Sequence, residues 1–169
     1  MSGTRELLIV RHAPAEDLAP GGDRARALTA EGRAEMALAA AGLARLIDPP
    51  ELIATSPLLR ALQTADLLAD RFPGARRAIL TELAPGFDRD LLASWIDAEP
   101  ARRLVLVGHE PDLSELVGWL IAGAAAARVR MRKGAAVALA LQGAAGPRAA
   151  ELEWSLTRGA LRRLGEGRG

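Results

Sequence analysis

The chain alternates short apolar runs with longer segments of mixed polarity. Two apolar runs, 6–10 and 103–107, are followed at once by polar residues, which is typical of buried strands. Shorter strands are predicted at 51–54, 78–80, 135–141 and 151–156, with a Gly/Pro loop over 143–147 between the last two.

Helices are predicted between these strands, over residues 30–47, 56–70, 88–98 and 112–122. Their starts carry capping signals, which are Thr29, then Ser56 with Pro57, and finally Asp112 with Glu115. Strands that alternate with helices predict an α/β fold, here a three-layer sandwich with a mostly parallel central sheet and helices on both faces. The ligand site of such a fold lies at the carboxyl ends of its strands.

Composition narrows the class of protein. The 169 residues predict one domain, residues 1–169, because a chain of this size buries enough surface to form a core. The sequence has no cysteine, which excludes disulfides, cysteine metal sites and a cysteine nucleophile. Its formal net charge of +1 argues against nucleic-acid and membrane-surface binding, since both need a basic field.

The amino-terminal residues do not resemble a signal peptide, because only four consecutive apolar residues, 7–10, precede Arg11. Apolar runs elsewhere are shorter than the ~20 residues that span a bilayer. We therefore expect a soluble, cytoplasmic protein.

The two histidines of the chain occupy equivalent places, since His12 and His109 each follow a buried strand. Arg11 lies at the end of the first strand, where an unpaired guanidinium is costly to bury and a bound anion would stabilise it. Arg60 lies in the first turns of a predicted helix, where free amides also favour an anion. Two arginines and two histidines together predict a phosphate-sized cationic pocket.

Such a pocket supports phosphoryl transfer with histidine as the nucleophile. A neutral imidazole nitrogen attacks phosphorus in line, while the guanidinium groups and the second imidazole hold the equatorial oxygens. This role needs no metal. An alkoxide leaving group would need an acid, and the candidates are Glu82, which follows the third strand, and Glu110, which adjoins the second histidine. A solvated surface position is an equally good interpretation of each.

Other chemistries fit the sequence less well. It contains no P-loop, dinucleotide-binding fingerprint, HExxH motif or serine nucleophile elbow. A metal site built from the histidines with Glu16 and Asp17 is disfavoured because Arg11 would repel a cation.

Five short motifs occur in a fixed order along the chain. They are Val10-Arg11-His12-Ala13, Arg26-Ala27-Leu28-Thr29 with Gly32, Thr55-Ser56-Pro57-Leu58-Leu59-Arg60-Ala61 with Gln63-Thr64-Ala65, Glu82-Leu83, and Val107-Gly108-His109-Glu110-Pro111. The ordered set covers most of residues 5–121 and resembles the histidine phosphatase superfamily. The short length and the tail, at 131–135 and 154–157, look most like its small SixA-like phosphohistidine phosphatases.

The resemblance implies roles for residues and no cofactor. His12 would be the phosphorylated nucleophile. The remaining implied residues are Arg11, Arg60 and His109 in the phosphate pocket, Arg26 at its mouth, Ser56 and Glu110 among the substrate-binding residues, and Glu82 as the proton donor if one is used. Ala13 stands where the superfamily often has glycine. Its side chain is small, so we expect the loop to keep its conformation, although a left-handed backbone there would be strained.

Chain length bears on the substrate. Only one helix and one strand fit between Glu82 and His109, so the inserted lid of the larger sugar-phosphate members has no room. An open site suits a phosphate carried by another protein. A phosphohistidine also leaves readily as neutral imidazole, since its unperturbed pKa is about 6.5. We therefore predict a metal-independent phosphatase that acts on phosphohistidine of a partner protein, such as a histidine-phosphotransfer domain.

Three alternatives remain open at this point. The chain could be a phosphomonoesterase or mutase of small phosphate esters, a non-catalytic phosphate-binding module, or a purely structural α/β domain. A monomer or weak oligomer is expected in each case.

Overall fold

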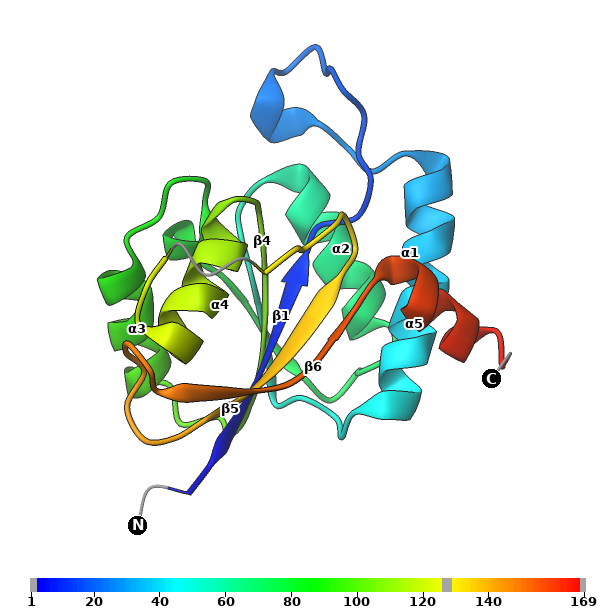
Figure 1. Cartoon of the computed structure of the whole chain (residues 1–169). Coiled ribbons are helices and arrows are strands. Elements are labelled where there is room, and N and C mark those ends of the chain that lie inside the picture. The colour runs from blue at the N-terminus through cyan, green and yellow to red at the C-terminus, as the bar shows by residue number, and fades with distance from the viewer. Residues whose placement is uncertain (1–2, 126–128, 168–169) are drawn as a thin grey trace.

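The strands form one six-stranded sheet in the order β3-β2-β4-β1-β5-β6. A computed structural model of the chain describes residues 3–125 and 129–167 (Figure 1). The strands are β1 (Arg5–Arg11), β2 (Leu52–Thr55), β3 (Arg76–Ile79), β4 (Arg103–Gly108), β5 (Ala136–Leu141) and β6 (Ala150–Leu156). Pairing is parallel from β3 through β1, and β5 runs antiparallel to both of its neighbours. The predicted mostly parallel sheet is confirmed.

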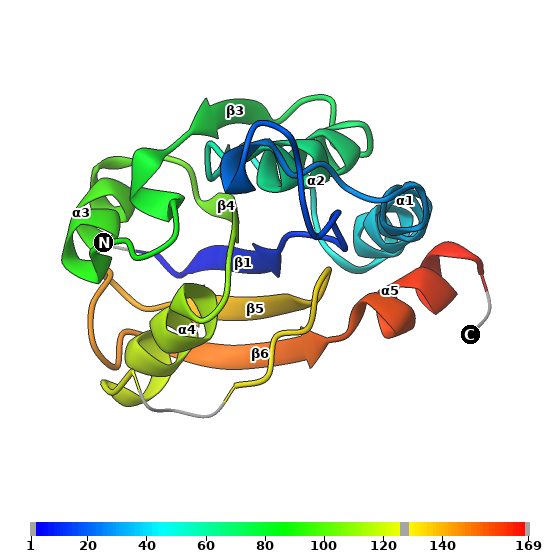
Figure 2. The ribbon, with the colours of Figure 1, turned by 90° about the horizontal axis from the view of Figure 1, so that it is seen from above.

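Helices cover both faces of the sheet, as Figure 2 shows. They are α1 (Ala30–Leu46), α2 (Leu59–Ala69), α3 (Arg89–Ala98), α4 (Asp112–Ala122) and α5 (Arg158–Gly165). Side chains alternate along β1, so Leu7 and Ile9 join the core beneath α3 and α4, while Leu8 and Val10 join the core beneath α1 and α2. Within the described part of the chain, every helix is too short or too polar to cross a bilayer.

The start of α2 differs from the prediction. Ser56 was expected as the N-cap, but the helix begins at Leu59 with Leu58 as its N-cap. The Ser56 hydroxyl does accept a hydrogen bond from the Leu58 amide at 3.2 Å, and at 2.7 Å it also contacts Nε2 of His109. Ser56 therefore belongs to a turn between β2 and α2 that faces the second histidine.

The predicted capping box of α4 was also wrong. Asp112 does not cap the helix, because its carboxylate accepts the amide of Gly86 at 2.7 Å. Glu115 lies 3.8 Å from Arg89 in an exposed ion pair. The first turn is instead satisfied by Glu110, whose carboxylate accepts the amide of Ser114 at 2.9 Å.

The last helix, α5, was not predicted, and it packs on α1 through glycine. A Cβ at Gly42 would lie 2.0 Å from the Leu161 carbonyl oxygen, and one at Gly165 would lie 2.0 Å from that of Leu38. Glycine and alanine form most of the buried face of α1, while Leu46 near its end is 41% exposed. Those small residues let the two helix backbones touch.

Candidate active site

The carboxyl edge of the sheet brings the two histidines together. β1 and β4 are parallel neighbours, and Arg11 pairs with Gly108 in the ladder. The His12 amide continues this register by donating to the Gly108 carbonyl at 3.0 Å. The imidazole rings are 5.2 Å apart between centroids, and both side chains are buried. The expectation that His12 and His109 share one site therefore agrees with the geometry.

His12 is held in one tautomer. Its Nδ1 lies 2.8 Å from the Ala13 carbonyl oxygen, which can only accept, so Nδ1 carries the proton and Nε2 keeps a lone pair. Burial, together with the smaller effects of the nearby His109, Arg60 and Arg11, lowers the pKa of His12 to about 3. The ring is neutral at neutral pH. Nε2 of His12 is thus a nucleophile that needs no deprotonation.

The loop after His12 keeps its shape with alanine in place of glycine. Ala13 is completely buried, and its amide donates to Thr64 Oγ1 at 3.0 Å. Arg148 is the one non-glycine residue with positive φ among residues 3–125 and 129–167, so Ala13 is not left-handed. The backbone strain that a left-handed alanine would carry does not arise.

His109 presents a different nitrogen to the pocket. Its Nε2 contacts the Ser56 hydroxyl, which already accepts the amide of Leu58 and so can donate its own proton to Nε2. A ring proton on Nδ1 is compatible with this arrangement, and Nδ1 is buried with no hydrogen-bond partner among the described residues. Burial, followed by the charge of Arg60, lowers the pKa of His109 to about 4. His109 is therefore a neutral donor.

Two guanidinium groups complete the pocket. Arg11 donates from Nη1 to the Met131 carbonyl at 3.0 Å, and Arg60 donates from Nη1 to the Asp23 carbonyl at 2.8 Å. In both side chains Nε is buried and makes no hydrogen bond within the described structure. Burial lowers the pKa of Arg11, which the charge of Glu110 partly offsets. Because unpaired buried donors are costly, a bound anion would stabilise both residues.

Asp23 is a site residue that the sequence did not reveal. It lies in the 3-10 turn η1 (Asp23–Ala25), in the blue loop beyond the carboxyl end of β1 in Figure 1. Its carboxylate lies 3.2 Å from Arg60 Nη2 and 2.7 Å from Arg26 Nη1. The hydrogen bond from Arg26, followed by those of Arg60, lowers the pKa of Asp23. Asp23 thereby holds Arg26 next to Arg60, and a place for Arg26 at the mouth of the pocket stays a prediction.

Thr64 joins the loop after His12 to the start of α2. Its hydroxyl accepts the Ala13 amide and donates to the Arg60 carbonyl at 2.7 Å. Gln63 on the same helix accepts the amide of Leu28 at 2.7 Å. The loop after β1, the start of α2 and the segment before α1 are therefore connected by side chains of α2.

The two predicted carboxylates lie apart from the pocket hydrogen bonds. Glu82 is half-buried in the 3-10 turn η2 (Thr81–Leu83) and accepts the Thr81 hydroxyl at 3.2 Å. Glu110 caps the first turn of α4 while its charge acts on Arg11. In the described residues, neither carboxylate is hydrogen-bonded to His12.

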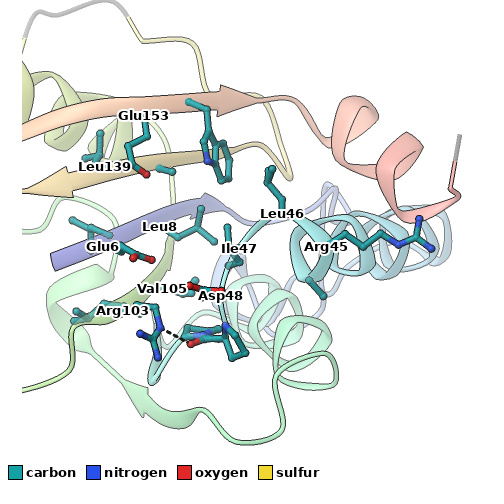
Figure 3. Close-up of a pocket in the computed structure, with 17 residues that line it drawn as sticks. Glu6, Leu8, Arg45, Leu46, Ile47, Asp48, Arg103, Val105, Leu139 and Glu153 are labelled. Carbon is teal, nitrogen blue, oxygen red and sulfur yellow. Dashed lines mark hydrogen bonds between the residues drawn. The ribbon is translucent and has the colours of Figure 1, made fainter. Parts of the chain in front are cut away.

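A separate groove of about 550 Å³ lies at the opposite edge of the sheet, where β1 and β4 begin (Figure 3). Its wall includes Leu8 and Trp154, and Arg103 donates to the Pro49 carbonyl at 2.8 Å. None of the predicted site residues lines it. Three or more His, Asp or Glu side chains placed to hold a metal are not found in the part of the chain that the structure describes.

Comparisons with known proteins point to one superfamily and one fold. The model of the histidine phosphatase superfamily (branch 1) matches residues 7–136. An uncharacterized protein of Picosynechococcus sp. is 37% identical over 138 residues, which are 79% of this chain and 84% of that protein. A SixA from Agrobacterium tumefaciens, assigned as a phosphohistidine phosphatase, has a similar structure, with a TM-score of 0.77, 25% identity, and coverage of 92% of this chain and 99% of that one. A SixA from Nakamurella multipartitia with the same assignment gives a TM-score of 0.75 and 25% identity, with coverage of 92% and 96%.

Proposed function

Because the chain belongs to the histidine phosphatase superfamily, we propose that it is a phosphatase that works through a phosphorylated His12 and needs no metal. The observation that carries this proposal is the tautomer of His12. Its Nδ1–H is fixed on the Ala13 carbonyl, which leaves the Nε2 lone pair in a pocket with two buried guanidinium groups. A site built only to bind phosphate would gain more from a second donor at that nitrogen.

The first step transfers the phosphoryl group to the protein. Nε2 of His12 attacks phosphorus in line and forms an N–P bond, while the bond to the leaving group breaks and its electron pair departs with that group. The Ala13 carbonyl stabilises the positive charge that the ring gains. Arg11, Arg60 and Nδ1–H of His109 hold the phosphoryl oxygens during the transfer.

The second step returns the protein to its starting state. Water attacks phosphorus, the N–P bond breaks, and its electron pair returns to Nε2 of His12. Both protons of the water stay with the product as dihydrogen phosphate, so no protein group must gain a proton. The step therefore needs no base, and the neutral ring of His12 is ready for another substrate.

The substrate that fits best is phosphohistidine on a partner protein. With a proton on its other ring nitrogen, the substrate's imidazole departs as a neutral group, whose conjugate acid has a pKa of about 6.5, so it does not need a closely placed acid. A substrate that needs no acid fits this site, because the carboxylates of Glu82 and Glu110 are hydrogen-bonded to Thr81 and Ser114. Only η2, α3 and their loops lie between β3 and β4, which leaves the site without an inserted lid there. The likeness to SixA proteins supports the same substrate.

The test is to trap the phosphorylated protein. Wild type incubated with radiolabelled phosphoramidate should acquire an acid-labile, alkali-stable label and release inorganic phosphate. His12→Ala should lose the label and about a thousandfold or more of turnover, whereas the exposed Arg71→Ala should match wild type. Undiminished turnover by His12→Ala would refute the mechanism.

Small phosphate esters are the alternative substrates. Labelled protein mixed with a panel of alcohols and sugars should lose its phosphate to water. Transfer to a second hydroxyl would instead identify a mutase. Tight phosphate binding without turnover of phosphoramidate, phosphohistidine peptide or aryl phosphate would identify a binding module.

A further inference from the structure

A basic groove adjoins the pocket on the side away from Asp23. The groove has a volume of about 590 Å³ and is lined by Arg11, Pro14, Arg132, Lys133, Thr157, Arg158 and Gly159. Four of these seven residues are cationic and none is acidic. Arg11 is common to the groove and the pocket, so a ligand in the groove lies next to a phosphate bound by Arg11.

Most of this positive charge is not neutralised within the protein. Arg158 forms an ion pair with Glu35 at 2.7 Å. The side chains of Arg132 and Lys133 make no hydrogen bond or ion pair with any described residue, and Arg132 is exposed while Lys133 is half-buried. Nε of Arg11 is also unpaired. The groove can therefore accept anionic groups without first breaking internal pairs at Arg132 and Lys133.

The backbone of the loop that carries Arg132 and Lys133 is tied to the backbone of the nucleophile. The amide of Gly134 donates to both the Arg11 and the His12 carbonyls, at 3.2 and 3.0 Å. Arg158 Nη1 donates to the Lys133 carbonyl at 3.0 Å, which ties α5 to the same loop. Gly134 has a φ of +76°, and a Cβ there would lie 2.9 Å from the Arg158 side chain, so glycine is needed at this position.

The loop around Asp23, in contrast, carries charges of both signs, because Arg26 and Arg60 pair with Asp23. Asp23 lies beside Arg60, and Glu16 and Asp17 are exposed in the loop that leads to it. A polyanion that spans the whole mouth would meet these carboxylates. An anionic segment that extends from the phosphate to one side only, over Arg132 and Lys133, would meet only cations.

We propose that the basic groove binds an acidic segment of the phosphorylated partner protein, with carboxylates close to the phosphorylated side chain. This proposal rests on the phosphatase function proposed above. The groove supplies electrostatic attraction that a free phosphate ester does not use, so it raises the rate of capture of an acidic phosphoprotein. It also selects among phosphoproteins by the charge next to the phosphate.

Two synthetic phosphohistidine peptides test the selection. They differ only in the two residues on each side of the phosphohistidine, which are aspartates in one and asparagines in the other. The kcat/KM of wild type at low salt should be about tenfold higher for the aspartate peptide, and 0.5 M NaCl, a concentration that shortens the Debye length to roughly 4 Å, should remove most of the difference. Equal kcat/KM values for the two peptides at low salt would overturn the proposal.

Charge reversal at Arg132 and Lys133 tests whether these residues cause the preference for the aspartate peptide. The double variant Arg132→Glu with Lys133→Glu should invert the preference, so that the asparagine peptide becomes the better substrate. Arg71→Glu makes a charge change of the same kind at the carboxyl end of α2 and should keep the wild-type preference. An unchanged preference in the double variant, measured as the ratio of the two kcat/KM values, would place the selectivity elsewhere and refute the groove.

A binding experiment separates this proposal from the phosphatase function. Fluorescence anisotropy with a labelled, unphosphorylated aspartate peptide should show binding to wild type, and the double variant should bind at least about tenfold more weakly. If wild type hydrolyses neither peptide, the phosphatase function fails while this measurement still decides on the groove. Tighter binding of a single-stranded oligonucleotide than of the peptide would contradict an acidic protein segment as the occupant.

Discussion

Asp23 binds the guanidinium of Arg60 through two oxygen atoms. Its carbonyl lies 2.8 Å from Nη1 and its carboxylate 3.2 Å from Nη2. The same carboxylate is paired with Arg26. A negative charge therefore lies among the cations that we assign to the phosphate, and a bound phosphate must share Arg60 with it.

Replacement of this charge should strengthen anion binding. In Asp23→Asn the backbone carbonyl still orients Arg60, but the competing carboxylate is gone. We expect the inhibition constant for inorganic phosphate to fall by about three- to tenfold, because removal of one partly exposed negative charge has an effect of this size. Asp17→Asn, in the same loop, removes an exposed carboxylate and should leave the constant near that of wild type. A constant that stays the same or rises in Asp23→Asn would contradict this account.

Neither carboxylate candidate should be essential for phosphohistidine. Glu82→Gln and Glu110→Gln are expected to retain kcat within about threefold on a phosphohistidine peptide, because neutral imidazole leaves without help. Steady-state rates with this peptide and with an alkyl phosphate check the expectation. A hundredfold loss on the peptide in either variant would show that an acid is required after all.

The main architecture could be predicted because it depends on local pattern. Apolar runs that end in polar residues located β1 and β4, and both histidines followed from those strand ends. The family assignment from ordered motifs is confirmed by the family model. In contrast, α5 was not predicted even though Thr157 caps it, because the helix is short and polar and Leu161 is the one buried residue among its eight.

Details that depend on three-dimensional neighbours could not be predicted. Ser56 and Asp112 have good capping side chains, yet one contacts His109 and the other accepts the Gly86 amide. Asp23 is an ordinary acid in a glycine-rich loop, and only the folding of η1 brings it to Arg60. A sequence pattern shows which bonds a side chain can make but not which partner comes within reach.

Loss of the Thr64 hydroxyl should weaken both stability and activity. In Thr64→Val the buried amide of Ala13 loses its acceptor, which costs about 1–3 kcal/mol of unfolding free energy. The kcat should also fall, because the loop after His12 is no longer tied to α2. Chemical denaturation and steady-state kinetics measure both effects. Thr64→Ser keeps the hydroxyl and should restore most of the unfolding free energy and most of kcat. Equal stability and equal kcat of the two variants would argue against a role for the hydrogen bond between Thr64 and Ala13.

Acidification should destabilise the folded protein. Burial lowers the pKa values of His12 and His109 to about 3 and about 4, whereas unfolded histidine has a pKa of about 6.5. Above pH ~6.5 neither state takes up these protons, and below it the unfolded state binds more, so stability falls as the pH drops towards 4. Each histidine contributes a loss of up to about 1.4 kcal/mol per pH unit.

Urea unfolding at a series of pH values, without phosphate, checks this expectation. His109→Asn should show a shallower fall between pH ~6.5 and ~4.5 than wild type, because only one buried histidine remains. Identical slopes for the two proteins would mean that His109 is protonated in the folded state.

The contact between α1 and α5 should not tolerate a side chain at Gly42. In Gly42→Ala the new methyl group meets the Leu161 carbonyl, and the helices must move apart at a cost of about 1–3 kcal/mol. The melting temperature should fall by about 3–10 °C. Gly74→Ala is the matched control, since a Cβ there contacts nothing within 4 Å. A melting temperature equal to that of the control would mean that the helices adjust freely.

The sheet order has a consequence for how the chain folds as it is made. β1 is synthesised first, yet both of its neighbours, β4 and β5, come from the second half of the chain. Until residues 103–108 have left the ribosome, the apolar strand that leads to His12 has two unpaired edges, which are open to pairing with other chains. The strand that leads to His12 therefore depends on early protection, and the candidate active site forms late in folding because each pairing of β1 closes a long loop.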